Sequence, residues 1–237
     1  PPCPNTFIIH TANFEPFSPK ALLASLLSSV HSPALSRDEA IKKLDPVQLL
    51  PVFDLPSAMQ AISEVSDALH QIQEERDRRR QLTQTGQPEG TEYHVPVVFI
   101  VAGLDTLAEG VIRASNPGKG AAVLTTALRT LTQLSRMHAS FLSVMLVNTS
   151  GLGTTSAPDP GPGLGGPDQR ETYQSRDDSI RSVFDQTGAS LFPNLLLKTL
   201  DQGIDTHVLL STVENTQVVE VIKDREGDGV GKWSIWD

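Results

Sequence analysis

Two apolar runs of strand length, joined through a helical pattern, restrict the fold of this chain more than any other feature. Residues 95–101 read VPVVFIV and residues 141–148 read FLSVMLVN. Runs of this kind are typical of strands that are buried on both faces of a sheet. Between them, four leucines within residues 124–134 recur at helical spacing. Strand, helix and strand in this order form a βαβ unit, so we predict an α/β fold with a sheet that is parallel at its centre.

Further elements are predicted on both sides of this unit. Ser36 and Glu39 have the spacing of a capping box, and Pro51 restricts its strand to a sheet edge or a bulge. The predicted elements are a strand over 6–11, helices over 21–30 and 36–44, an edge strand over 47–53, a helix from 57 into the basic run 74–80, a helix near 191–201, and strands over 207–213, 218–223 and 233–236. Short turns separate the last strands, which indicates antiparallel hairpins, and Trp233 and Trp236 are expected to pack in the core.

Composition excludes several classes of protein. Hydrophobic residues make up 38% and charged residues 20%, which excludes a fully disordered chain and a multi-span membrane protein. The formal charge of -9 excludes a broadly basic nucleic-acid binder. A single cysteine, Cys3, and six scattered histidines predict neither an intrachain disulfide nor a structural metal site. Because the sequence does not begin with Met, we expect it to begin inside a longer chain.

One segment is rich in glycine and proline. Ten of the seventeen residues from 151 to 167 are Gly or Pro, so a regular helix or strand is excluded there. We predict a long loop over residues 151–190. Residues 161–166 match the dinucleotide-binding pattern Gly-x-Gly-x-x-Gly by letter, but no strand and helix flank them.

Polar residues follow the predicted parallel strands, at the sheet edge where ligands of such folds bind. Acids, amides and hydroxyls of this kind can hold a nucleotide phosphate with Mg²⁺, although polar residues also end strands in α/β proteins generally. These residues are His10, Thr11, Asn13 and Glu15 after the first strand, Asp105 and Thr106 after the central strand, and Asn148, Thr149 and Ser150 after the next. Residues 113–120 fail the P-loop pattern at both ends, so no P-loop is present in these residues.

Basic residues are concentrated in two places. Arg113 and Lys119 are predicted in the loop after the central strand, within residues 105–147, where four basic residues outnumber two acidic ones. A nucleic-acid contact is one interpretation of this pair. The run of arginines over 76–80 alternates with acids at a helix end and is typical of a solvated surface.

The order of elements resembles the ATPase core of the RecA/Rad51 recombinase superfamily. Residues 6–23 (TFIIHTANFEPFSPKALL), the strand VPVVFIVAGLDTL, the segment SNPGKGAAVLTTALRTLTQLSR and the strand FLSVMLVNT follow one another as in that family. Residues 17–22 fit its Phe-x-Pro-x-x-Leu helix start, Gly118-Lys119-Gly120 resembles its first DNA-binding loop, and residues 151–190 occupy the place of its second. The chain thus resembles a divergent eukaryotic, fungal recombinase paralogue.

The departures from the family pattern concern catalysis. The resemblance places the family's catalytic glutamate at Ala12, its Walker B aspartate at about Ala102 and its γ-phosphate sensor at Thr149. Glu15 and Asp105 are the nearest acids and are therefore the candidate catalytic residues. The resemblance also implies nucleotide contacts by Asp105, Asn148 and Thr149 and DNA contacts by Arg113 and Lys119.

The resemblance implies one RecA-like core domain over residues 1–237, a three-layer fold of the P-loop NTPase type with a mainly parallel sheet and C-terminal antiparallel strands, without its P-loop segment. It implies a nuclear subunit in homologous-recombination repair that is a non-catalytic scaffold. Other recombinase-family subunits and single-stranded DNA are the expected partners, with no membrane association and no cofactor. Two alternatives stay open: a DNA-stimulated ATPase that binds ATP and Mg²⁺ through a P-loop upstream of residue 1, and an unrelated doubly wound binding domain.

Overall fold

The chain divides into two compact units, Pro1–Thr149 (unit 1) and Ser150–Asp237 (unit 2). The computed structural model describes residues 4–28, 35–83, 95–148, 182–184 and 195–236. Unit 1 has a four-stranded sheet and unit 2 has a three-stranded sheet. The α/β class is confirmed, and the single RecA-like domain over residues 1–237 stays a prediction.

The sheet of unit 1 is parallel throughout. Its strand order is β2 (Val47–Val52), β1 (Thr6–Thr11), β3 (Val97–Ala102) and β4 (Leu142–Val147), and every neighbouring pair is parallel. The predicted parallel centre and the predicted edge position of the strand containing Pro51 are both confirmed. An edge suits Pro51 because proline has no N–H to donate to a neighbouring strand.

The last strand of this sheet is less buried than its sequence predicts. Within the described residues β4 pairs with β3 alone and forms the other edge of the sheet. Met145 is 55% exposed, and the only described β4 residue that is fully buried is Leu142. The prediction of a second strand buried on both faces was therefore wrong, because an apolar run does not reveal the strand's position in the sheet.

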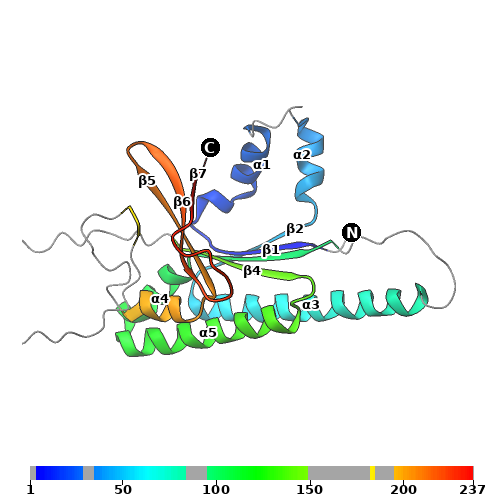
Figure 1. The fold of residues 1–237 in the computed structure, drawn as a ribbon. Coiled ribbons are helices and arrows are strands. Elements are labelled where there is room, and N and C mark those ends of the chain that lie inside the picture. Colours follow the sequence, from blue (N-terminus) through cyan, green and yellow to red (C-terminus); the bar gives the residue numbers. More distant parts are fainter. Residues whose placement is uncertain (1–3, 29–34, 84–94, 149–181, 185–194, 237) are drawn as a thin grey trace, which may run out of the picture. The chain divides into compact units, whose positions relative to one another are not determined.

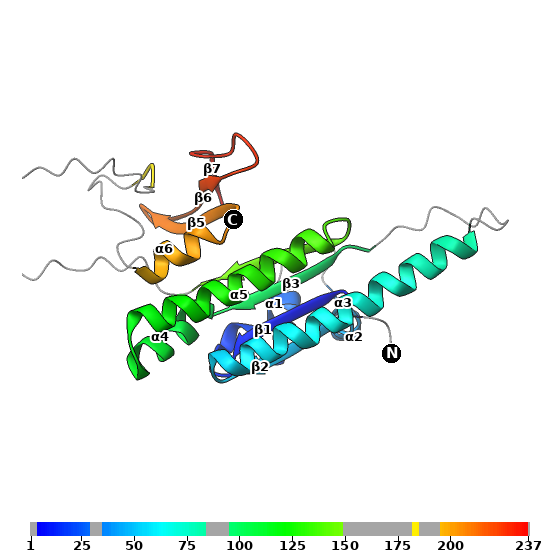
Figure 2. The ribbon, with the colours of Figure 1, turned by 90° about the horizontal axis from the view of Figure 1, so that it is seen from below.

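Helices lie on both sides of the parallel sheet (Figure 1). Helices α3 (Leu55–Thr83), α4 (Leu104–Ala114) and α5 (Pro117–Met137) lie on one side, and α1 (Pro19–Ser28) and α2 (Arg37–Leu44) lie on the other. Seen from below, α3 and α5 run side by side along the sheet (Figure 2). This arrangement is compatible with the three layers expected of an α/β fold.

The core of unit 1 lies between the sheet and the long helices. Four consecutive residues of β1 are buried, as are alternate residues of β3 up to Val101 and the apolar stripes of α3 and α5. The predicted helical spacing of the four leucines within residues 124–134 is confirmed. Members of this core include Phe7, Ile9, Val97, Phe99 and Val101 from the strands and Ile62, Val65, Leu69, Leu124, Leu128 and Leu131 from the helices.

Helix α3 extends well beyond the sheet that it covers. Its 29 residues span about 43 Å, whereas a six-residue strand spans about 20 Å. Leu69 is its last buried residue. Beyond that point Arg78 pairs with Glu75 (2.9 Å) and Arg80 with Asp77 (3.5 Å). These arginines form a solvated helix surface with local ion pairs, as expected. Arg76 differs from this prediction, because it is partly buried, donates to the Val95 carbonyl (2.6 Å) and lies over the Phe141 ring at 4.3 Å.

Side-chain caps fix the starts of α1 and α2. The Ser18 hydroxyl accepts a hydrogen bond from the Ala21 N–H (3.2 Å). Ser36 and Glu39 form a complete capping box at α2, which confirms the predicted start of that helix. Residues 29 and 30 of the first predicted helix lie outside the described residues.

The connection between β3 and β4 is a helical hairpin. One residue, Gly103, joins β3 to α4, and its φ of +78° is a conformation that favours glycine. A Cβ on Gly103 would lie 3.1 Å from Cγ2 of Thr11. At the start of α5, a Cβ on Gly120 would overlap the Ile112 side chain of α4. Both glycines therefore allow close packing of the hairpin.

Unit 2 contains the antiparallel strands that the sequence predicts. Strands β5 (Thr206–Val213), β6 (Thr216–Asp224) and β7 (Trp233–Ile235) follow one another in the sheet, preceded by α6 (Leu195–Gln202). The β5–β6 turn places Glu214 and Asn215 at positive φ, which matches the twist of a two-residue hairpin. The start of the predicted helix near 191–201 lies outside the described residues.

The two tryptophans of the last strand are not in a core. Trp233 is 55% exposed and Trp236 is 59% exposed, so the expected core packing was wrong. Among the described strands β7 pairs with β6 alone and lies at an edge of the sheet, and all three of its residues are exposed. Trp233 contacts the Phe184 ring edge-on at a centroid distance of 5.3 Å.

Candidate functional site

The carboxyl ends of β1, β3 and β4 lie side by side at one edge of the parallel sheet. His10 is level with Ala102, and Ala102 is level with Val147. The Gly103 N–H donates to the Val147 carbonyl at 2.8 Å, which holds the ends of β3 and β4 together. The turns that carry the predicted site residues therefore meet at one edge, as the parallel arrangement predicts.

The two acids nearest this edge lie in different environments. Asp105 is the second residue of α4 and is fully buried. Glu15 begins the short 3-10 helix η1 (Glu15–Phe17) and is exposed. Solvent reaches the carboxylate of Glu15 and does not reach that of Asp105, so in this structure only Glu15 is available to a ligand.

Asn148 is the described candidate after β4. Its side-chain oxygen is buried and has no hydrogen-bond partner among the described residues. A buried amide oxygen without a donor is destabilising, so this position favours a ligand or water that donates a hydrogen bond. Thr149, Ser150 and most of the predicted loop over 151–190 lie outside the described residues.

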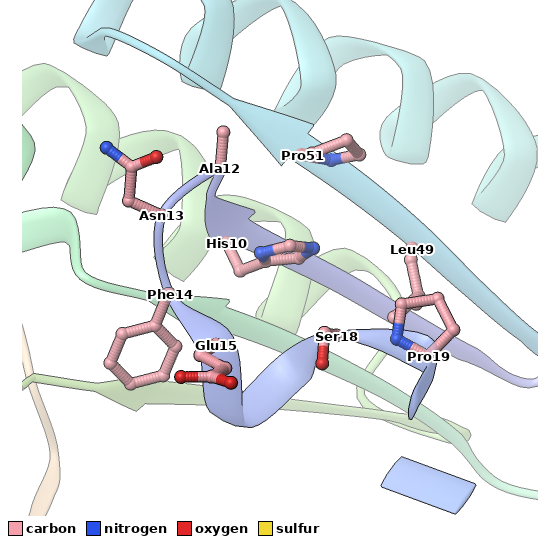
Figure 3. Close-up of a pocket in the computed structure, with 9 residues that line it drawn as sticks. All are labelled: His10, Ala12, Asn13, Phe14, Glu15, Ser18, Pro19, Leu49 and Pro51. Carbon is pink, nitrogen blue, oxygen red and sulfur yellow. The ribbon is translucent and has the colours of Figure 1, made fainter. Parts of the chain in front are cut away.

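A cavity of about 400 Å³ opens beside the end of β1 (Figure 3). Its volume falls in the lower part of the range of small-ligand sites. The described residues that line it come from β1, the turn after it, η1, the start of α1 and β2. They are His10, Ala12, Asn13, Phe14, Glu15, Ser18, Pro19, Leu49 and Pro51.

His10 is the most buried polar residue of this cavity, at 6% exposure. Its Nδ1 lies 2.9 Å from the carbonyl oxygen of Thr11. Because a carbonyl only accepts, Nδ1 is assigned as the donor of this hydrogen bond, which makes Nε2 the acceptor of this tautomer. Figure 3 shows the ring among Ser18, Leu49 and Pro51. The fold thus positions one hydrogen-bond acceptor inside a mainly apolar cavity.

The predicted DNA-contacting pair lies on helices and not in a loop. Arg113 belongs to the last turn of α4, where it pairs with Glu109 at 3.0 Å, and Lys119 belongs to the first turn of α5. The predicted loop after the central strand was therefore wrong: residues 104–114 form an amphipathic helix, and Asn116 caps the next one through the Lys119 N–H (2.9 Å). Both side chains are exposed.

The tip of the α4–α5 hairpin (residues 113–119) lies at the same end of unit 1 as the carboxyl ends of the strands (Figure 1). This placement follows from the topology, since α4 starts directly after β3 and α5 returns to the amino end of β4. The hairpin tip and the cavity are separate features of one end of the sheet.

Sequence reasoning named His10 and Glu15 but missed most of the cavity walls. Leu49 and Pro51 lie on β2, which pairs in parallel with β1 so that His10 is level with Pro51. The sequence did predict an edge strand over residues 47–53, which carries these two wall residues. It did not identify the strand that pairs with it, so the wall residues could not be placed next to His10.

Neither a metal-binding cluster nor a membrane-spanning helix is found within the described ranges. No group of three or more His, Cys, Asp or Glu residues there could hold a metal ion. None of the helices found in those ranges is both long and apolar enough to cross a bilayer.

No protein-family model matches the chain, and no curated protein matches it.

Proposed function

We propose that this chain is a non-catalytic subunit of the recombinase-paralogue type, which acts in the nucleus in DNA repair by homologous recombination. It associates with other recombinase-family subunits and contacts single-stranded DNA through the tip of the α4–α5 hairpin. The observation that carries the proposal is the meeting of three strand ends at one sheet edge, with alanine at the two positions where the resemblance expects catalytic carboxylates.

The strand ends support the resemblance at the level of topology. A shared nucleotide site requires the turns after three strands to lie together, and the ends of β1, β3 and β4 are adjacent and in register. The order of these strands along the chain is the one on which the resemblance rests.

The side chains at this edge support a non-catalytic role. The methyl groups of Ala12 and Ala102 can neither bind Mg²⁺ nor orient a water molecule. Asp105 is fully buried, and Glu15 lies at the cavity beside β2. Hydrolysis without a positioned carboxylate loses its main electrostatic contribution.

The hairpin tip supports a modest contact with DNA. Arg113 is exposed although it pairs with Glu109, and exposed pairs of this type are weak and easily exchanged for a phosphate. Lys119 is exposed at the other side of the tip. Because the chain has a net charge of -9, these two cations provide only a local contact with DNA. We therefore expect the chain to bind its protein partners more strongly than DNA.

The first experiment measures single-stranded DNA binding by filter binding at increasing salt. Replacing both Arg113 and Lys119 by Ala is expected to weaken binding and to reduce the salt slope by about 1.4, since each phosphate contact to a single strand contributes about 0.7. The matched control replaces Arg129 and Arg136 by Ala. These exposed residues lie on the same helix α5, about 15 Å and 26 Å along the axis from Lys119.

Four outcomes contradict parts of the proposal. An unchanged salt slope in the Arg113/Lys119 double variant removes the DNA contact, and equal changes in both double variants show an effect of net charge alone. ATP hydrolysis above background in the presence of single-stranded DNA contradicts the non-catalytic role. Purification of the tagged chain from cells without any recombinase-family protein contradicts the proposed assembly.

A further inference from the structure

The cavity beside β1 has features that the proposed function does not use. Its described walls are mainly apolar: Phe14 from the turn after β1, Pro19 from α1, and Leu49 and Pro51 from β2. These side chains come from three elements that pack around the end of one strand, so the cavity is built by the fold. Walls of this kind suit the methylene groups of a long side chain.

Two polar groups of the cavity, His10 and Glu15, can accept hydrogen bonds from a ligand, and Asn13 and Ser18, which also line it, carry donors as well as acceptors. His10 presents the Nε2 lone pair, because its Nδ1 is bonded to Thr11. Glu15 is the one residue with a formal charge among the described residues that line the cavity, and its carboxylate is exposed at the rim. An anionic ligand would meet this carboxylate without a compensating cation, so phosphate and carboxylate groups are disfavoured.

We propose that this cavity binds an arginine side chain of a partner protein. The aliphatic stem packs between Pro19, Leu49 and Pro51, and the guanidinium donates hydrogen bonds to His10 Nε2 and the Glu15 carboxylate. The choice of occupant rests on charge complementarity, since a ligand with an apolar stem and a cationic head matches apolar walls with acceptors. The inference goes beyond the proposed function and does not depend on DNA binding.

Arginine fits this site better than lysine. The guanidinium is planar, carries five donors and is less strongly hydrated than an ammonium group. It can therefore satisfy two acceptors on different elements while one of its faces lies against an aromatic ring, here Phe14. Arginine is also enriched at protein–protein interfaces, where it is a frequent hot-spot residue.

The test uses blocked peptides and NMR. The isotope-labelled chain is titrated with acetyl-Gly-Arg-Gly-amide, and the side-chain signals of His10 and the amide signals of Asn13 and Glu15 are followed. Saturable shifts are expected, with a dissociation constant on the order of 1 mM for a single side chain. The matched peptide carries citrulline, which has the same shape without the charge, and is expected to bind about threefold to fivefold more weakly because Glu15 is exposed.

Variants connect the binding to the cavity. Glu15→Gln is expected to reduce the preference for arginine over citrulline to near one, and Leu49→Trp to abolish the shifts by filling the cavity. Glu74→Gln, an exposed acid on α3, is the control and should leave both peptides unchanged. Glu15→Gln lies on the surface, so it reports on binding even if Leu49→Trp disturbs the fold.

Several results would overturn the inference. The absence of saturable shifts, equal affinity for arginine and citrulline peptides, or an unchanged preference in Glu15→Gln each contradicts it. Shifts of the same residues by inorganic phosphate would show that the cavity prefers an anion. Since no DNA is present, these results are independent of the salt titration that tests the proposed function.

Discussion

The sheets of the two units are stabilised in different ways. In unit 1, the parallel sheet buries a continuous set of large apolar side chains against α3 and α5. In unit 2, the buried apolar residues among those described are Leu200, Val218 and Ile222, and a carboxylate, Glu220, is buried beside them. Burial of apolar surface therefore dominates unit 1, whereas unit 2 depends more on specific hydrogen bonds.

The buried carboxylate of unit 2 has identified donors. Glu220 accepts hydrogen bonds from the Ser182 hydroxyl (2.6 Å) and the Val183 N–H (2.7 Å). A loop of unit 2 is held in a similar manner, because the Asp224 carboxylate accepts from the N–H groups of Gly227 and Gly229 at 3.1 Å. These bonds lower the pKa of Asp224 below its ordinary value, with the Gly229 N–H as the largest cause. Polar side chains thus organise the backbone of unit 2.

The largest effect is expected from a cavity in the core of unit 1. Phe99 is fully buried at the centre of β3, so Phe99→Ala should lower the free energy of unfolding by about 3–5 kcal/mol. Urea denaturation measures this loss. The comparison variant Val208→Ala changes an exposed apolar residue of unit 2 and should stay within about 0.5 kcal/mol of the wild type. If both variants lost the same free energy of unfolding, apolar burial would not distinguish unit 1 from unit 2.

An intermediate effect is expected from Glu220→Ala. The change leaves the Val183 N–H and the Ser182 hydroxyl without their acceptor, which should cost about 2 kcal/mol. Hydrogen exchange at the Val183 amide measures the local loss, and exchange in β1 and β3 should not change. Glu220→Gln keeps one acceptor oxygen and should lose less. Slow exchange of Val183 in Glu220→Ala would show that the carboxylate does not hold this segment.

The smallest effect concerns the pH dependence of unit 1. His138 is buried, and neither ring nitrogen has a hydrogen-bond partner within the described residues. Burial, and next the nearby charge of His70, lower the pKa of His138 below its ordinary value of 6.5. The unfolded chain therefore binds a proton more readily, so stability from this group is complete above pH 6.5 and is lost as the pH falls toward the folded pKa.

His138→Phe tests this dependence. The variant keeps an aromatic ring next to Phe141 and removes the titrating group. Its free energy of unfolding should fall less steeply than that of the wild type between pH 6.5 and pH 5, as measured by urea denaturation at each pH. His70→Phe is the control for the exposed partner ring. Parallel profiles for the wild type and His138→Phe would contradict the assignment.

Short-range sequence patterns predicted the helices and strands of this fold, whereas the long-range pairing of strands determined which residues are buried. The capping box of Ser36 and Glu39 and the apolar stripe of α3 involve residues within a few turns, so the sequence predicted them. The predicted stripe extends to Ile72, whereas burial in the structure ends at Leu69. The burial of Met145 and Trp233 depends on which strands are edges, and among the short-range patterns only Pro51 marked an edge strand. This is why both residues were expected to be more buried than they are.

In the candidate site, too, short-range patterns predicted some residues and long-range strand pairing determined the others. His10 and Glu15 were predicted because they lie near the carboxyl end of the first strand, whereas the wall residues Leu49 and Pro51 depend on the pairing of β2 with β1. Helix α4 was missed although Leu104, Leu107 and Ala108 have helical spacing, because Gly103 and Gly110 interrupt the segment and favour a loop interpretation. Tertiary packing against α5 overrides this local preference.

The single residue between β3 and α4 has a mechanical consequence. A joint of one glycine provides two backbone torsions, and the hydrogen bond from the Gly103 N–H to the Val147 carbonyl ties this joint to the neighbouring strand. Helix α4 therefore moves with the centre of the sheet as one body. A displacement of the hairpin tip is therefore transmitted to β3, because no flexible loop lies between α4 and that strand. The NMR amide signal of Gly103, which lies away from the tip, should therefore shift when a ligand binds at the tip.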